Sequence, residues 1–151
     1  VVGARNNNRK LDGFPWLEDE LVVIVPHNHK LSGKSEVQLD SLLTEKWIFR
    51  EKGSGTRKAV EELMVKHGIS REDLNIFMEA GSTEAVLAVV ESGMGISIVS
   101  KWAIKEETKR RFHSLKLREG DARRMFYVIY PRQKSRRKSV MDFLDYLQSV
   151  K

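Results

Sequence analysis

One stretch of eight residues, 50–57 (REKGSGTR), combines glycines, hydroxyl side chains and charges in an order that suits anion binding. The short apolar segment 47–49 precedes it, and apolar side chains recur at helical spacing over residues 58–67. The first N–H groups of a helix have no partner within that helix, and the helix dipole adds partial positive charge there. Ser54, Gly55 and Thr56 therefore predict a site for a small anion or carboxylate.

Two simpler roles stay open for the side chains of this stretch. Ser54 or Thr56 is also suited to cap its own helix, since most helices need such a cap. Arg57 is placed either to add positive charge to the site or to pair with Glu61, one helical turn further on. These residues alone do not decide between an anion site and a capped helix.

A second helix start has the same character. Gly81 is followed by Ser82 and Thr83, which open a helix whose apolar side lies within residues 85–90. Strands alternate with helices along the chain, which predicts an α/β fold with a mainly parallel sheet. Ligands of such sheets bind beyond the carboxyl ends of the strands, at helix N-termini. The two helix starts are therefore expected to converge on one ligand site.

The remaining elements follow from apolar patterns and from turn residues. Strands are expected at residues 21–25, 47–49, 74–79, 94–99, 113–117 and 125–130. Helices are expected at residues 35–43, 58–67, 85–91, 101–108 and 136–150. Residues 11–19 are expected to be irregular, and residues 119–121 to form a turn.

The 151 residues suffice for one domain of ordinary size or for two small lobes. Hydrophobic residues make up 40% and charged residues 32%, which is typical of a soluble globular protein and not of a disordered one. No apolar run approaches the ~20 residues of a membrane span, and the start is not a signal peptide. The chain begins at Val1 without a Met, so we expect an N-terminal part of a longer protein to precede it.

Several kinds of chemistry have no support in the sequence. The chain has no cysteine, which excludes disulfides, thiolate metal sites and a cysteine nucleophile. His27 and His29 lack a nearby third ligand, so they make a poor metal site and no metal is expected. The glycines of residues 53–58 fit neither a P-loop nor a dinucleotide fingerprint, and no nucleophile elbow is present. We therefore expect no enzyme activity and no cofactor.

Positive charge is concentrated in the last third of the chain. The net charge is +6, and between Lys101 and Lys138 there are 14 basic residues against four acidic ones. Such a bias is compatible with nucleic-acid contact, with a solvated surface, or with a basic lobe that faces an acidic ligand. No strand with interleaved aromatic residues accompanies it, which favours the solvated surface.

The order and spacing of four segments resemble one protein family. They are residues 19–24 (DELVVI), 29–31 (HKL), 50–57 (REKGSGTR) and 79–99 (EAGSTEAVLAVVESGMGISIV). The series covers essentially the whole chain and resembles the effector-binding domain of LysR-type transcriptional regulators. Lys30 and Ser100 depart from the family, which commonly has proline at those two positions.

The resemblance implies two Rossmann-like subdomains joined by crossover strands, as in type 2 periplasmic binding proteins, with a small effector in the cleft between them. Residues 1–26 would then be a remnant of the first subdomain with a crossover strand, and residues 27–121 a complete second subdomain. Residues 122–151 would supply the return strand and the C-terminal helix. The rest of the first subdomain, including the other helix start of the cleft, would lie outside this chain.

The same resemblance implies a ligand-sensing domain of a bacterial transcription factor. Matched to the family's cleft, Ser54, Gly55 and Thr56 would be backbone and hydroxyl donors to the effector, and Ser82 and Thr83 match the cleft positions more weakly. The expected partners are a small, anionic effector and further copies of the chain in a homodimer or homotetramer. DNA would be bound only by a helix-turn-helix domain outside this chain, no membrane contact is expected, and the location would be cytoplasmic. The alternative is a solute-binding protein of a transport system, which shares the fold.

Overall fold

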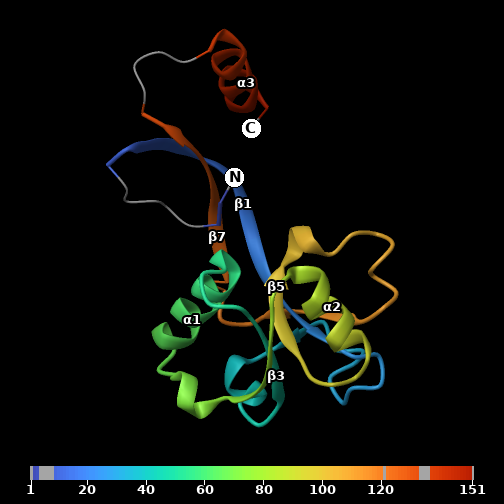
Figure 1. Cartoon of the computed structure of the whole chain (residues 1–151). Helices are drawn as coiled ribbons and strands as arrows, with labels where there is room; N and C mark the ends of the chain where they lie inside the picture. Colours follow the sequence, from blue (N-terminus) through green and yellow to red (C-terminus); the bar gives the residue numbers. More distant parts are fainter. Residues whose placement is uncertain (1, 4–8, 121, 133–136, 151) are drawn as a thin grey trace. The chain divides into compact units, whose positions relative to one another are not determined.

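The structure is a computed structural model, and it describes residues 2–3, 9–120, 122–132 and 137–150. The chain divides into two compact units (Figure 1). Unit 1 consists of Val1–Asp19 and Arg124–Lys151, and unit 2 consists of Glu20–Arg123. Both predicted helix starts belong to unit 2, so that unit positions the candidate site.

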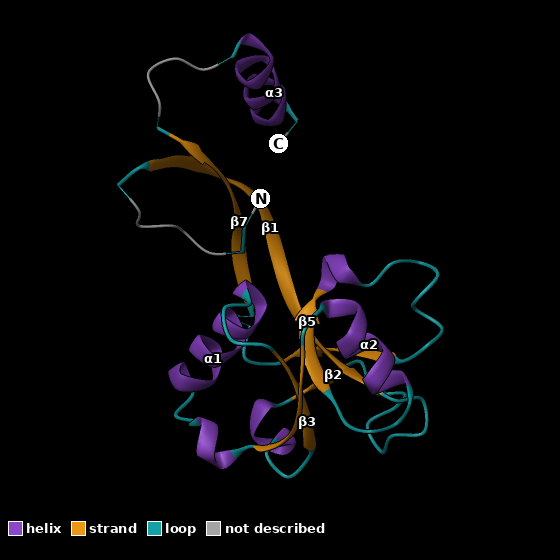
Figure 2. Cartoon of the chain, viewed as in Figure 1, coloured by secondary structure: helices purple, strands orange, loops and turns teal. Residues whose placement is uncertain are grey.

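Figure 2 distinguishes the helices from the strands of the chain. The strands are β1 (Leu11–Val25), β2 (Glu36–Val37), β3 (Lys46–Arg50), β4 (Asn75–Ala80), β5 (Ser97–Ser100), β6 (His113–Leu117) and β7 (Arg123–Pro131). The α-helices are α1 (Gly55–Lys66), α2 (Thr83–Glu91) and α3 (Lys138–Ser149). Three short 3₁₀ turns, η1 (Leu39–Leu42), η2 (Arg71–Asp73) and η3 (Lys101–Ala103), complete the described elements.

The sheet of unit 2 is mixed, not mainly parallel as the sequence predicted. Strand β1 pairs antiparallel with both β5 and β6, while β2 pairs parallel with β6. Strands β3 and β4 are parallel to each other. Ile96, just before β5, joins β3 through hydrogen bonds with the backbone of Ile48 and Lys46, each 2.8 Å long. The strand at residues 21–25 was predicted, but its antiparallel direction was not, because an unbroken apolar run indicates burial and not direction.

Successive side chains of β1 point alternately into two hydrophobic clusters. Leu21, Val23 and Val25 pack in the cluster that contains the buried side of α1, whereas Val22 and Ile24 pack in the cluster of α2. Helices α1 and α2 therefore cover opposite faces of the sheet (Figure 1). Successive side chains of a strand point to opposite faces, so a continuous apolar run indicates burial on both.

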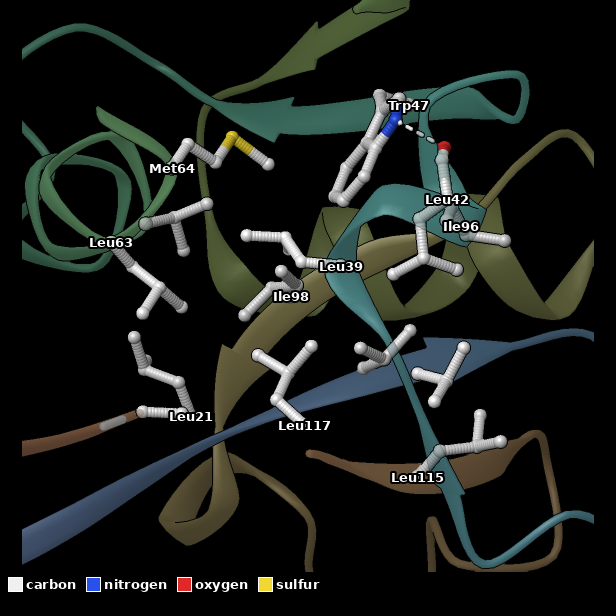
Figure 3. Packing of buried hydrophobic residues seen from close by; sticks show 14 of the residues in the cluster. Leu21, Leu39, Leu42, Trp47, Leu63, Met64, Ile96, Ile98, Leu115 and Leu117 are labelled. Carbon is white, nitrogen blue, oxygen red and sulfur yellow. Dashed lines mark hydrogen bonds between the residues drawn. The ribbon is translucent and has the colours of Figure 1, made fainter. Parts of the chain in front are cut away.

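The cluster on the α1 side includes Trp47 and also fixes the turn η1. Figure 3 shows Trp47 above Leu39 and Leu42, with Met64 and Leu63 of α1 opposite. The Trp47 indole N–H donates to the Leu42 carbonyl over 3.0 Å. A buried tryptophan needs such a partner for its only polar group, and the bond ties β3 to the segment before it.

Unit 1 has a core of its own. Val128, Leu144 and Leu147 are buried there, with Trp16 and Tyr130 among the residues packed against them. The Trp16 indole N–H donates to the Leu147 carbonyl over 3.0 Å, which ties α3 to β1. No helix in the described part of the chain is long and apolar enough to cross a membrane.

Most predicted elements are present, and three predictions are wrong. Residues 11–19 are strand, because they pair with β7 in spite of Pro15. The helix expected over residues 35–43 is the short strand β2 followed by η1, because Glu36 and Val37 pair with β6. The helix expected over residues 101–108 is only the turn η3. Asp121 of the expected turn and Arg136 of the expected last helix lie outside the described residues.

Candidate anion-binding site

The parallel pairing of β3 with β4 brings the two helix starts to one edge of the sheet. Arg50, the last residue of β3, lies beside Ala80, the last residue of β4. The Glu51 amide then donates to the Ala80 carbonyl over 3.0 Å, which continues the contact past the ends of both strands. Helix α1 begins four residues after Glu51, and α2 begins three residues after Ala80. Both helix starts therefore follow the same edge of the sheet.

Ser54 is the N-cap of α1, as the simpler interpretation supposed. Its buried hydroxyl accepts from the Arg57 amide over 3.4 Å, and its own amide donates to the Glu51 carbonyl over 3.2 Å. Gly53 completes this turn with φ at +93°, a conformation that side-chain-bearing residues rarely adopt. Gly55 follows as the first helical residue and is partly exposed. The turn thus fixes where α1 begins.

Ser82 and Thr83 divide their tasks at the start of α2. The Ser82 hydroxyl is the N-cap and accepts from the Ala85 amide over 3.0 Å. The Thr83 hydroxyl instead accepts a hydrogen bond from Nη1 of Arg50, 2.5 Å away. This bond connects the end of β3 to the start of α2, so a side chain as well as the backbone joins the two predicted halves of the site.

Arg57 holds α1 onto the sheet and does not face solvent. Its side chain is 5% exposed, and its guanidinium pairs with Glu61 at 2.7 Å and with Glu79 of β4 at 3.0 Å. Nη1 also donates to the Arg50 carbonyl over 3.0 Å, and the guanidinium lies over the Phe49 ring. Burial opposes the charge, but the bonds to Glu61 and Glu79 raise the pKa of Arg57 overall. Of the two roles left open by the sequence, the pairing with Glu61 is the one present.

Arg50 is the polar residue that the sequence analysis left out of the site. Its Nε and Nη2 donate to the two carboxylate oxygens of Glu51, at 2.8 and 2.9 Å. This bidentate pair lowers the pKa of Glu51 to about 2, with a hydrogen bond to the Glu51 backbone amide as the second cause. The same pair raises the pKa of Arg50. A charged residue at the carboxyl end of a parallel strand, one position before the glycine turn, was the signal available in the sequence.

Thr56 and Arg50 line the same small cavity in unit 2. The cavity has a volume of about 10 Å³, enough for one water molecule, and Phe49 and Ser97 contribute to its wall. A metabolite does not fit inside it, so a ligand of this edge would lie outside the cavity. A wider, open hollow of about 560 Å³ runs along β4 and η2, from Arg71 to Glu79, and contains none of the five predicted site residues.

The structure bears on two further features of the sequence, the histidines and the basic region. Among the described residues, no group of three or more His, Asp or Glu side chains is placed to hold a metal ion. His27 stacks edge-on against His113, with ring centres 4.8 Å apart, and His29 contacts Glu45. Among the described residues, the basic side chains between residues 101 and 138 that pair with carboxylates include Lys101 with Glu20, Lys109 with Glu106, Arg111 with Glu91, Arg118 with Glu36, and Arg124 with Asp19. These pairs favour the solvated surface over a nucleic-acid interface.

One known protein family matches the whole chain. The family described as the LysR substrate binding domain matches residues 1–151. The chain belongs to this family. Named relatives agree. The HTH-type transcriptional activator CmpR of Synechocystis is 36% identical over 149 residues, covering 97% of this chain and 47% of CmpR. The RuBisCO operon transcriptional regulator of Allochromatium vinosum is 33% identical over 135 residues, covering 89% of this chain and 44% of that protein.

This LysR substrate-binding chain spans less than half the length of those two relatives. Among solved structures, the CcmR regulatory domain of Synechocystis PCC6803 in complex with 2-PG matches with a TM-score of 0.86 and 35% identity, over 99% of this chain and 71% of that one. The effector-binding domain of QuiR in complex with shikimate matches with a TM-score of 0.87 at 21% identity, over 98% and 68%, and supports the fold alone. The predicted family and the predicted α/β fold of the type 2 periplasmic-binding-protein kind are confirmed.

Proposed function

We propose that this chain is the effector-sensing region of a LysR-type transcription factor that acts in the cytoplasm. The family match and the regulators among its relatives support this role. In the proposed whole protein, a helix-turn-helix region outside this chain binds DNA, and the protein is a homodimer or homotetramer. The alternative of a solute-binding protein for transport is not favoured, because the relatives are transcriptional regulators.

The proposed effector is a small anion that binds where α1 and α2 begin. Gly55, Thr56 and Thr83 are the proposed contacts, while Ser54 and Ser82 hold the two helix starts in place as N-caps. The observation that carries this proposal is the parallel pairing of β3 with β4, which brings both helix starts to one edge. Partial positive charge at two helix starts favours an anion there. The related CcmR domain was solved with 2-PG bound, which supports a small-molecule ligand.

In this proposal the effector regulates by binding one arrangement of the protein more tightly than another. A ligand shifts an equilibrium only by its difference in affinity between the two states. Occupancy of the site would thereby change how the oligomer binds DNA, and DNA binding would change effector affinity by the same factor.

Calorimetric titration of the chain with 2-PG, inorganic phosphate and succinate tests the proposed site. Thr56→Val keeps the shape of the side chain but removes its hydroxyl. We expect binding of at least one of these anions to weaken about tenfold, since a hydrogen bond to a charged group contributes roughly 1.5–3 kcal/mol. Thr108→Val is the matched control, because it removes a hydroxyl that bonds only locally to the Lys105 carbonyl among the contacts described. Equal weakening by both variants, or by neither, would count against the site.

A further inference from the structure

We propose that Arg50 is the charged anchor of the effector and that Glu51 occupies it as an internal competitor until an anion replaces the Glu51 carboxylate. This inference rests on the proposed function and adds to it how the site selects its ligand. The ligand class it names is a small anion with two oxygens on one centre, such as a carboxylate or a phosphate.

The first step is the geometry of the contact. Nε and Nη2 of Arg50 donate to the two Glu51 oxygens at 2.8 and 2.9 Å. This side-by-side pairing is the one by which a planar guanidinium recognises carboxylates and phosphates in general. A carboxylate of the protein itself therefore already occupies the binding position that an anionic ligand would use.

The second step is the position of Arg50 within the site. Its side chain is 18% exposed, Nη1 donates to the Thr83 hydroxyl, and the residue lines the same cavity as Thr56. Arg50 thus contacts the start of α2 and lies beside the start of α1. Arg57, by contrast, is enclosed by Glu61, Glu79 and a backbone carbonyl, so its charge is committed to the fold.

The third step is that Glu51 can leave without disturbing the backbone. The Glu51 amide donates to the Ala80 carbonyl over 3.0 Å, and the Glu51 carbonyl accepts from the Ser54 amide over 3.2 Å. Its side chain, however, is 41% exposed on the turn. Because that side chain already reaches water, the Glu51 carboxylate can exchange its contact with Arg50 for hydration when an anion takes its place. Rotation of the Glu51 side chain into water is enough to open the anchor.

A calorimetric titration with inorganic phosphate and with succinate tests this exchange in three variants of the chain. Glu51→Gln removes the competing charge, and we expect it to bind the anions about twofold to fivefold more tightly than the unchanged chain. Arg50→Gln removes the anchor, and we expect binding to weaken about tenfold or more. Glu36→Gln is the matched control, because it also removes one negative charge from an exposed pair, that with Arg118, and it should leave affinity unchanged.

The Glu51 side-chain carboxyl resonance in the same titrations shows whether the exchange takes place. It should move toward the position of a solvated carboxylate as phosphate binds. Equal affinity in the unchanged chain and in Glu51→Gln, or full binding by Arg50→Gln, would overturn the inference. If Thr56→Val still weakens binding in that case, the proposed site stands without this anchor. If no anion binds even to Glu51→Gln, both the inference and the proposed site are wrong.

Discussion

Helices α1 and α2 begin with the same kind of cap but continue differently. A serine hydroxyl caps each helix by accepting from the amide three residues on, Ser54 from Arg57 and Ser82 from Ala85. That third residue is a buried cation in α1 and a small apolar side chain in α2. The first turn of α2 also contains Glu84, whereas the first turn of α1 has no acidic residue.

The difference shows that one local pattern produces two different electrostatic environments. A negative side chain in the first turn complements the helix dipole, so Glu84 already offsets part of the positive end of α2. Helix α1 has no such group in its first turn, and its start is the more favourable of the two for an external anion. We infer that α1 supplies most of the attraction, while α2 mainly orients Arg50 through Thr83.

Among the substitutions that test this difference between the two helix starts, Arg57→Ala should have the largest effect, a loss of stability. Arg57→Ala removes a buried guanidinium that bonds to Glu61, Glu79 and the Arg50 carbonyl, and we expect a loss of about 2 kcal/mol in the free energy of unfolding. Glu61 and Glu79 are partly exposed and regain water, which keeps the loss below that of a fully buried pair. Urea denaturation measures it.

Arg71→Ala is the control for Arg57→Ala. Arg71 pairs with the same two carboxylates, Glu79 at 2.7 Å and Glu61 at 3.7 Å, but its side chain is 42% exposed. Its loss should cost about 0.5 kcal/mol or less. Similar costs for the two variants would mean that burial of Arg57 is not what distinguishes the start of α1.

A smaller effect is expected at the caps themselves. Ser82→Ala should cost about 1 kcal/mol of unfolding free energy, a typical value for a lost N-cap. Ser54→Ala should cost less, about 0.5 kcal/mol, because its cap bond is long at 3.4 Å against 3.0 Å for Ser82. Thermal unfolding of both variants shows which substitution costs more unfolding free energy. A larger cost for Ser54→Ala would contradict this expectation.

The smallest effect concerns pH. The Arg50 pair lowers the pKa of Glu51 from 4.5 to about 2 in the folded chain. Its stabilising contribution is therefore complete above pH 4.5 and declines as the pH falls from there to about 2. An NMR titration of the Glu51 carboxyl group should have its midpoint near pH 2 in the unchanged chain. In Arg50→Gln the midpoint should move back toward the ordinary value, and an unchanged midpoint would show that Arg50 is not the cause.

Periodic apolar patterns predicted the helices and most strands of unit 2, because burial on one face leaves a regular spacing in the sequence. Glycine marked the ends of α1 and α2, where Gly68 and Gly93 have φ at +76° and +83°. Pairing with distant segments was not predictable in this way. Residues 11–19 became strand through β7, and Glu36 joined β6, since partners far along the chain outweigh local preference.

The positions of the two helix starts were predictable to the same extent. Gly55, Ser82 and their neighbours stood out because glycine and hydroxyl residues have known roles at helix starts. Arg50 was not among the predicted site residues, because its contact with Thr83 depends on how β3 and β4 pair. The role of Arg57 was undecided for the same reason, since Glu79 comes from another strand.

The most direct measurement is a backbone amide NMR titration of the isotopically labelled chain with inorganic phosphate. If an anion binds where the two helices begin, the amide signals of Gly55, Thr56 and Thr83 shift together along one binding curve. If those signals stay fixed while others move, for example along the hollow between Arg71 and Glu79, the anion binds elsewhere and the account is wrong.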